Sequence, residues 1–407
     1  MAAKPRPRRS LLQALPKNVA KKDDFFEERC RAILRGKLIP IIGETIRIAH
    51  IFDVDYDQEL GVDDEPDDDA QDSDFDMTET ENGNDEDELV LNVTEQLAQL
   101  WAQEISYPLV DDHQIARVAQ YNKLIKENAR TANESYLVFL KNTLLNVAEG
   151  LCRFDSDNEQ LAFIEQLRLE RLLSFSDIVT ELDFPTFPNG RQDPLRILAR
   201  LPLKIYIATG YHEFIERELE AAGKHPRSRL CFWNMRPDSV AKEHQFDHDY
   251  KPDADNPVVY HLFGMERYPE SLVLSEDDYL DLLWALAKDI PGDSGERIIP
   301  PFLEAELHDS SLLLLGYRLQ DWDLSVLFHG LLWGGHTDIS RRLASTAIHL
   351  DLKEQPLVRD RKKAELYLKS YFGQAQLDVQ FGDSDDFVAK LWQEWRRFSQ
   401  GSGGLSS

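Results

Sequence analysis

The sequence predicts an α/β fold built on a doubly wound, mostly parallel sheet with a large helical insertion. Short runs that are almost entirely apolar recur along the chain, and such runs are typical of parallel strands buried on both faces. In the second half of the chain, amphipathic helical segments separate these runs, and this alternation is typical of a doubly wound sheet. The expected strands cover residues 38–42, 203–209, 229–234, 257–264, 311–317, 345–352 and 376–381.

The first elements are a short helix over residues 24–36, closed by Gly36, and the strand 38–42. Pro40 lacks an N–H group, so we expect this strand to lie at a sheet edge or to have Pro40 near its start. The segment from Asp53 to Glu88 then holds 19 Asp and Glu residues and no Lys or Arg, which predicts a disordered loop. It could be a solubilising insertion, a docking arm for a basic partner or a mimic of nucleic-acid charge.

Apolar residues recur at spacings of three and four between residues 93 and 200, which predicts a helical module with Thr94 at its first cap. This module separates the first strand from the others. The expected parts of the chain are a flexible basic N-terminus (1–23), the first helix, strand and glycine turn (24–52), an acidic disordered insertion (53–90), a helical subdomain (91–200), the rest of the sheet domain (201–399) and a flexible tail (400–407).

Composition excludes several classes of protein. No apolar run approaches the roughly 20 residues that span a bilayer, and the basic N-terminus lacks the apolar stretch of a signal peptide, so we expect no membrane contact and a cytoplasmic protein. Cys30, Cys152 and Cys231 lie far apart, which predicts neither a metal site nor a disulfide framework. The net charge of −28 leaves no broad basic surface, which argues against direct nucleic-acid binding.

Ligands of doubly wound sheets bind at the carboxyl ends of the strands, where the chain turns into helices. Four segments of this kind contain glycine, and they cover residues 43–47, 208–212, 261–264 and 316–323. Each one alone is weak support for a site, because a strand followed by glycine is common. Their order along the chain is more specific.

In this order, "IPIIGETIR", "ATGYHEFIE", "VVYHLFGMERYPESLVLSEDDYLDLL" and "LLLLGYRLQDWD" resemble the SIR2-like (sirtuin-related) family, in particular the bacterial domains of antiphage defence. The resemblance runs from about Leu38 to Phe398, with the acidic tract as an insertion. The matching positions include Thr209, Tyr211, Glu216, Leu262, Gly264, Ser275, Glu276, Asp278 and Tyr279.

The resemblance implies a Rossmann-like domain that takes NAD as ligand or substrate. Defence members hydrolyse NAD to nicotinamide and ADP-ribose, so the implied partners are NAD or ADP-ribose and either further copies of the chain or another protein of a defence complex. The family's zinc-binding cysteine pairs are absent, which argues against protein deacetylation. The implied nucleotide-binding residues are Gly43, Thr45, Thr209, Gly210, Gly264 and Gly316.

The sequence departs from the family where the chemistry occurs. Gly210 stands in place of the Asn that holds the nicotinamide ribose, and Phe263 stands in place of the His that acts as general base. Thr45 replaces a glycine, and Glu44 adds a negative charge beside the expected pyrophosphate site. We therefore expect weak or lost hydrolysis, because neither glycine nor a phenyl ring transfers protons.

Two histidines could replace the missing groups. His261 lies two residues before Phe263, and on a strand such residues share a face. His212 lies two residues after Gly210. Both are candidate catalytic residues of an active NADase. Alternatively, His261 is an interior histidine and His212 is a polar residue at a helix start. A third reading is a scaffold that binds no nucleotide, with side chains such as Phe263 filling the pocket.

Overall fold

The computed structural model describes residues 22–52 and 91–402, apart from 127, 156–157, 171, 186, 188–191, 235–241, 245–249, 290–296, 318–321, 328–345, 351–357, 359 and 375–376. The acidic insertion predicted over 53–90 therefore lies outside the described residues, as do residues 1–21 and 403–407.

In the described residues, seven parallel strands form one sheet in the order β3-β4-β2-β1-β5-β6-β7. The chain enters at the centre of the sheet and builds outward on both sides, which confirms the predicted doubly wound α/β fold. The strands are β1 (Leu38–Ile42), β2 (Ile205–Ala208), β3 (Arg227–Leu230), β4 (Val258–His261), β5 (Ser311–Tyr317), β6 (Thr346–Leu350) and β7 (Asp378–Phe381).

The prediction from Pro40 is wrong, because β1 is the central strand and Pro40 is its middle residue, paired with Leu313 of β5. Hydrogen bonds between β1 and β5 involve Lys37 and Gly43 at the two ends, so the odd-numbered residues bond toward β5. Alternate residues of a parallel strand bond to opposite neighbours, so the missing N–H of Pro40 faces β2. Pairing with β2 begins only at Ile41, and Pro40 therefore interrupts no established ladder.

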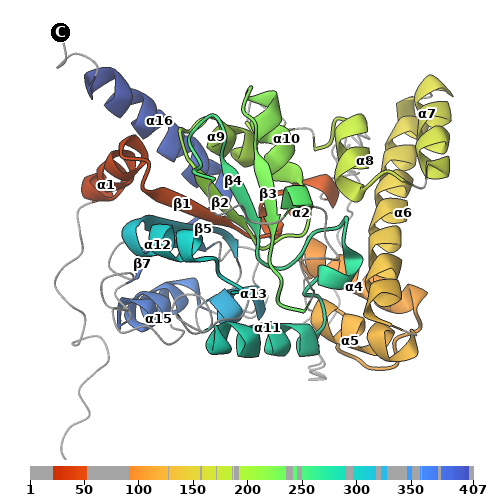
Figure 1. Cartoon of the computed structure of the whole chain (residues 1–407). Coiled ribbons are helices and arrows are strands. Elements are labelled where there is room, and N and C mark those ends of the chain that lie inside the picture. Colours follow the sequence, from red (N-terminus) through yellow and green to blue (C-terminus); the bar gives the residue numbers. More distant parts are fainter. Residues whose placement is uncertain are drawn as a thin grey trace, which may run out of the picture.

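The two faces of the sheet bury separate hydrophobic clusters. Leu38 and Ile42 of β1 belong to one cluster, and Ile39 and Ile41 belong to the other, as the strand period of two requires. Figure 1 shows helices covering both faces. The first cluster packs under α1 (Lys22–Leu34), α9 (Pro194–Arg200), α10 (Phe214–Ala221) and α16 (Ser384–Ser402). The second packs under α11 (Glu276–Lys288), α12 (Pro301–Asp309), α13 (Trp322–Val326) and α15 (Arg361–Gln374).

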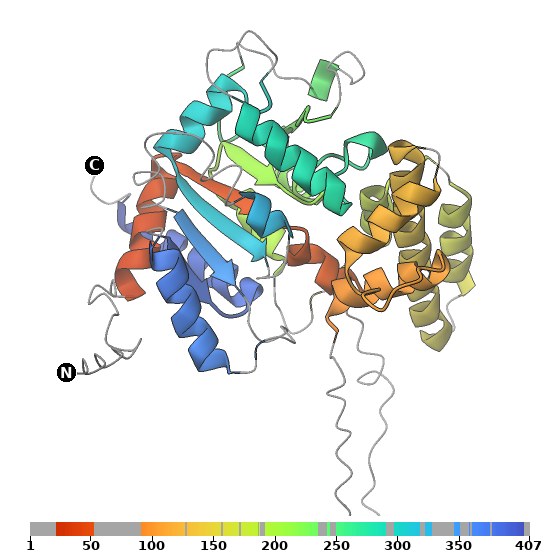
Figure 2. The ribbon, with the colours of Figure 1, turned by 90° about the horizontal axis from the view of Figure 1, so that it is seen from below.

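A group of helices lies beside the sheet, as Figures 1 and 2 show. Asn92, rather than Thr94, caps the first of them, and its side chain accepts a hydrogen bond from the N–H of Glu95 at 3.1 Å. This group comprises α4 (Val93–Glu104), α5 (Ile115–Ile125), α6 (Ala129–Asp155), α7 (Asn158–Leu169) and α8 (Phe175–Glu181). Two 3₁₀ turns, Lys242–His244 and Pro269–Ser271, lie elsewhere in the chain.

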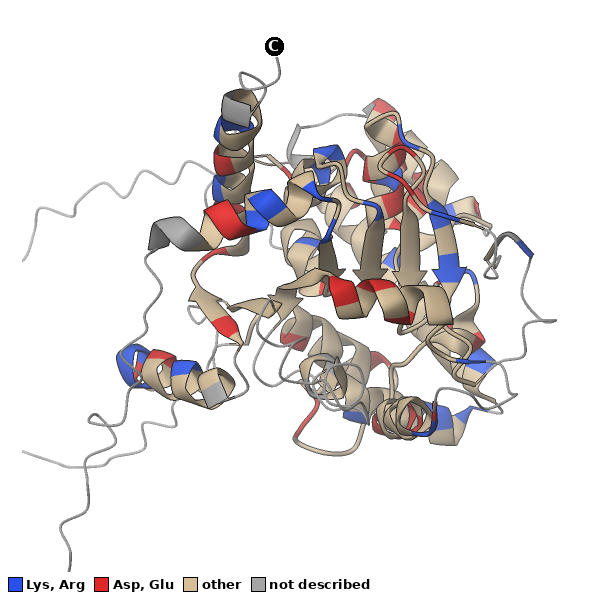
Figure 3. Ribbon diagram, turned by 60° about the vertical axis from the view of Figure 1, so that its left-hand side comes forward, with Lys and Arg blue, Asp and Glu red and all other residues tan. Residues whose placement is uncertain are grey.

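The helix α9 falls inside the predicted helical subdomain but packs against α10 and α16 over the sheet. The domain boundaries themselves stay a prediction. Acidic and basic bands are interspersed along the helices in view in Figure 3. None of the helices in the described part of the chain is both long and apolar enough to cross a bilayer.

Candidate functional site

The turns that follow β1 and β2 meet at the carboxyl edge of the sheet, where they enclose a small cavity. Gly43, Glu44, Gly210 and His212 line this cavity together with apolar residues and Arg47. Its volume is about 30 Å³, which is room for a few water molecules at most. The structure thus brings together Gly43, Gly210 and His212, which were predicted for the site, and it places Glu44 beside them.

The ends of β1 and β5 are in direct contact at two glycines. A Cβ atom on Gly43 would lie 2.1 Å from the carbonyl oxygen of Gly316, so no larger residue fits there without moving the backbone. Gly316 has a φ of +75°, which favours glycine. The hydroxyl of Thr45 donates to the carbonyl oxygen of Gly316 at 2.7 Å. The predicted binding residues of this turn therefore bond to one another.

Thr209 joins three strands at the same edge. Its N–H donates to the carbonyl oxygen of Ile42 at 2.9 Å, and its hydroxyl lies 2.8 Å from the hydroxyl of Tyr317. The next residue, Gly210, packs against Glu44, because a Cβ atom on Gly210 would lie 3.3 Å from the Glu44 Cα atom. The position expected to hold the catalytic amide is therefore in contact with an acidic residue.

His212 is a buried cation between two carboxylates. Its Nε2 lies 3.6 Å from Oε1 of Glu44, and its Nδ1 lies 3.6 Å from Oε2 of Glu266. Burial alone lowers the pKa of His212, but the two carboxylates outweigh burial and raise the pKa to about 9. The imidazole is therefore protonated at neutral pH and cannot accept a proton there.

Glu266 connects this histidine to the helices beside the sheet. Its carboxylate accepts hydrogen bonds from the N–H groups of Phe175 at 2.9 Å and Ser176 at 3.3 Å, at the start of α8. Burial raises the pKa of Glu266, but the combined effect of His212 and Ser176 in the opposite direction is larger, so the net shift is downward. A carboxylate at a helix start is also favoured by the helix dipole.

The second candidate histidine, His261, forms a buried ion pair away from the cavity. Its Nε2 lies 2.6 Å from Oε1 of Glu216 on α10, and the Ser228 hydroxyl donates to the same oxygen at 2.8 Å. Burial opposes both charges, yet the pair raises the pKa of His261 and lowers that of Glu216. His261 is thus engaged in joining β4 to α10.

The face that His261 and Phe263 were expected to share is not found. The strand β4 ends at His261 and the following residues form a turn, so the strand period no longer applies. Phe263 packs instead on Tyr279 of α11, with ring centroids 5.7 Å apart, and Tyr279 stacks on Trp322 of α13 at 6.1 Å. Three aromatic rings therefore occupy the surroundings of the position expected for the general base.

Gly264, predicted to bind the nucleotide, is explained by packing. Its φ is +98°, and a Cβ atom would lie 2.4 Å from the carbonyl oxygen of Ser271. It does not line the cavity at Gly43.

Sequence reasoning missed a buried ionic network beneath the cavity. Nη2 of Arg47 lies 3.1 Å from Oδ2 of Asp193 and 3.2 Å from Oε1 of Glu218. Arg47 therefore links α2 (Thr45–Phe52) to the residue that caps α9 and to the middle of α10. Burial raises the pKa of Asp193, although Arg47 opposes this shift. The Asp193-Pro194 pair was an available signal, since Asp followed by Pro is typical of a helix start.

Part of the chain is similar to known proteins. Residues 204–372, from the strand before the candidate turn to α15, match the family model described as SIR2-like domain. The chain therefore carries a SIR2-like domain, as its sequence motifs predicted, and β1 with its glycine turn precedes the matched residues.

The chain is also similar to a curated protein, the NAD(+) hydrolase ThsA of Cytobacillus dafuensis, with 24% identity over 232 residues. These residues are 53% of this chain and 42% of that relative, so the chain spans less than half of the relative's length.

Proposed function

We propose that the chain is a SIR2-like protein of NAD-related antiphage defence in which hydrolysis of NAD is lost or weak. It binds NAD or an ADP-ribose-type nucleotide and acts within an assembly of its own copies or with a partner protein. The SIR2-like domain and the similarity to an NAD(+) hydrolase support the nucleotide class.

One observation supports the loss of hydrolysis above all others. Both positions of the expected catalytic groups hold groups that transfer no proton, since Gly210 packs on Glu44 and Phe263 packs on Tyr279. The two histidines nearby offer no replacement, because His212 and His261 are each held by carboxylates. His212 is protonated at neutral pH and His261 does not line the cavity, so neither of them replaces the missing general base there.

The described residues of this edge do not fit a nicotinamide ribose. The cavity of about 30 Å³ is far below the roughly 300 Å³ or more of ordinary ligand pockets, and Glu44 repels a phosphate. A bound nucleotide would have to part Glu44 from Gly210, and this rearrangement lowers its affinity.

The small cavity favours a second candidate function, a scaffold that binds no nucleotide. Calorimetric titration of the full chain with NAD and with ADP-ribose separates the two. Saturable heat with either nucleotide supports the binding protein, and the absence of heat at millimolar nucleotide supports the scaffold. Release of many nicotinamide molecules per chain would contradict both and support an active NADase.

A further inference from the structure

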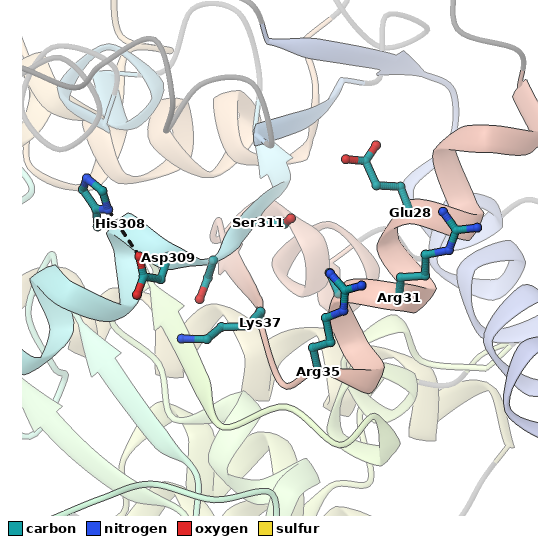
Figure 4. Close-up of a pocket in the computed structure, with 9 residues that line it drawn as sticks. Glu28, Arg31, Arg35, Lys37, His308, Asp309 and Ser311 are labelled. Carbon is teal, nitrogen blue, oxygen red and sulfur yellow. Dashed lines mark hydrogen bonds and ion pairs between the residues drawn. The ribbon is translucent and has the colours of Figure 1, made fainter. Parts of the chain in front are cut away.

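A second and larger cavity lies at the opposite, amino-terminal edge of the sheet, and Figure 4 shows it. Lys37 directly precedes β1 and Ser311 begins β5, so both mark this edge. The cavity has a volume of about 630 Å³, within the range of about 300–1,000 Å³ that is typical of small-molecule sites. The other residues of its lining are Glu28, Arg31, Ala32, Arg35, His308, Asp309 and Ser310.

The backbone on one side of this cavity is fixed. Gly36 has a φ of +60° and donates to the carbonyl oxygen of Ile33 at 2.9 Å, while the N–H of Lys37 donates to that of Ala32 at 2.8 Å. These bonds are a Schellman motif, which ends α1 in a single conformation. The carbonyl oxygen of Lys37 then accepts from the N–H of Ser311 at 2.8 Å, which ties α1 to β5. The cationic side chains thus start from a rigid frame.

Three cations on this frame line the cavity. Arg31 pairs with Glu27, but the two side chains are 57% and 47% exposed, and exposed pairs contribute little. Nζ of Lys37 lies 3.0 Å from Oε2 of Glu306. In the part of the chain that the structure describes, no acidic side chain forms an ion pair with Arg35. Its guanidinium is therefore available to an anion.

The lining also restricts the class of ligand. Ala32 is the one apolar residue among the described residues around the cavity, and no aromatic ring is available there to stack on a nucleobase. The carboxylates of Glu28 and Asp309 suit hydroxyl groups, which donate hydrogen bonds to them. Figure 4 shows the α1 side chains on one side of the cavity and His308 with Asp309 on the other. Asp309 thus faces the α1 side chains across the cavity, and Glu28 lies on the same side as Arg31.

We propose that this cavity binds a small phosphorylated sugar. The phosphate lies against Arg31, Arg35 and Lys37, because guanidinium and ammonium groups donate strong hydrogen bonds to phosphate oxygens. The sugar hydroxyls face Glu28 and Asp309. This site is distinct from the turns at the carboxyl edge and does not depend on the function proposed for them.

Calorimetric titration of the full chain with ribose 5-phosphate, ribose and inorganic phosphate tests the proposal. We expect ribose 5-phosphate to bind more tightly than inorganic phosphate and ribose to give no saturable heat. Arg35→Gln should weaken ribose 5-phosphate binding about tenfold or more, because a hydrogen bond to a charged group contributes about 1.5–3 kcal/mol. Glu306→Gln should strengthen it, because this change frees Lys37 from its ion pair.

The matched control is Arg397→Gln. Arg397 is an exposed arginine of α16 that pairs with Glu394 and does not line the cavity, so its removal should leave binding unchanged. Arg35 is also exposed, so the thermal midpoint of Arg35→Gln should match that of the unaltered chain. The proposal is overturned by no saturable heat with ribose 5-phosphate or by equal affinity in Arg35→Gln. Inorganic phosphate binding as tightly as the sugar phosphate would also overturn it.

Discussion

Nε2 of His261 lies 2.6 Å from Oε1 of Glu216 in a fully buried pair that joins β4 to α10. The pair identifies His261 as a residue that holds the sheet to its covering helix. Glu216→Ala would leave the histidine buried without its partner, and removing one member of a buried pair typically costs about 3–5 kcal/mol. We therefore expect Glu216→Ala to lower the free energy of unfolding in urea by this amount.

Glu134→Ala is the control for that variant. Glu134 pairs with Arg130, but the two side chains are 44% and 63% exposed. Pairs of this kind contribute about 0.5 kcal/mol or less in helices. A loss in Glu216→Ala no larger than the loss in Glu134→Ala would contradict the structural role of the His261 pair.

The raised pKa of His212 predicts a loss of stability in alkaline solution. Its pKa rises from 6.5 to about 9 on folding, so its contribution is fully present below pH 6.5 and is lost as pH rises toward 9. A shift of this size is worth up to about 3 kcal/mol. Urea unfolding of the unaltered chain should show this loss, and the loss should be smaller in His212→Gln, where only the other histidines with a raised pKa, such as His261, still contribute.

His349 provides the control with the opposite sign. Burial lowers its pKa from 6.5 to about 4, so its contribution to stability is lost as pH falls from 6.5 toward 4. His349→Asn should remove this acid-side loss and leave the alkaline loss unchanged. Equal alkaline behaviour of the unaltered chain and His212→Gln would show that His212 is not a buried cation.

The contact between Gly43 and Gly316 predicts a strong effect of one methyl group. In Gly43→Ala the new Cβ atom would lie 2.1 Å from a backbone oxygen, so the ends of β1 and β5 must separate. Overpacking of this kind typically costs about 1–3 kcal/mol. Gly373→Ala is the matched control, because nothing lies within 4 Å of its Cβ position. Unfolding of both variants in urea tests the difference, and equal stability would contradict the contact.

Removal of the negative charge at Glu44 should improve nucleotide binding. Glu44 lies in the turn where a pyrophosphate would bind, so Glu44→Gln removes a repulsion of about 1 kcal/mol, which is roughly fivefold in Kd. It also lowers the pKa of His212. Calorimetry with ADP-ribose measures the change. Unchanged or weaker binding in Glu44→Gln would place the nucleotide away from this turn.

The middle of the sheet could be predicted from the sequence because its strands β1, β2, β4, β5 and β6 are largely apolar and buried, whereas the edge strand β3 has the polar sequence Arg-Ser-Arg-Leu. The central place of β1 could not be predicted from the sequence. A proline fits in this strand because pairing with β2 begins only after Pro40, at Ile41, and the sequence does not show where pairing begins. Gly210 and Phe263, at the positions where the family resemblance implies Asn and His, could also be read from the sequence.

The state of the two candidate histidines depends on contacts between distant residues. Glu216 meets His261 only because α10 crosses β4, and Glu266 meets His212 only because the turn after β4 reaches the start of α8. No periodicity or motif encodes these approaches. The end of β4 at His261 likewise decided which face Phe263 occupies.

We propose that the positions expected to carry the catalytic groups do not support hydrolysis of NAD. The most direct measurement is the release of nicotinamide by the full chain incubated with an excess of NAD. We predict no more than one nicotinamide per chain in the unaltered protein. Continued release over many turnovers would contradict the account, and its loss in a His212→Ala, His261→Ala double variant would identify the histidines as the source.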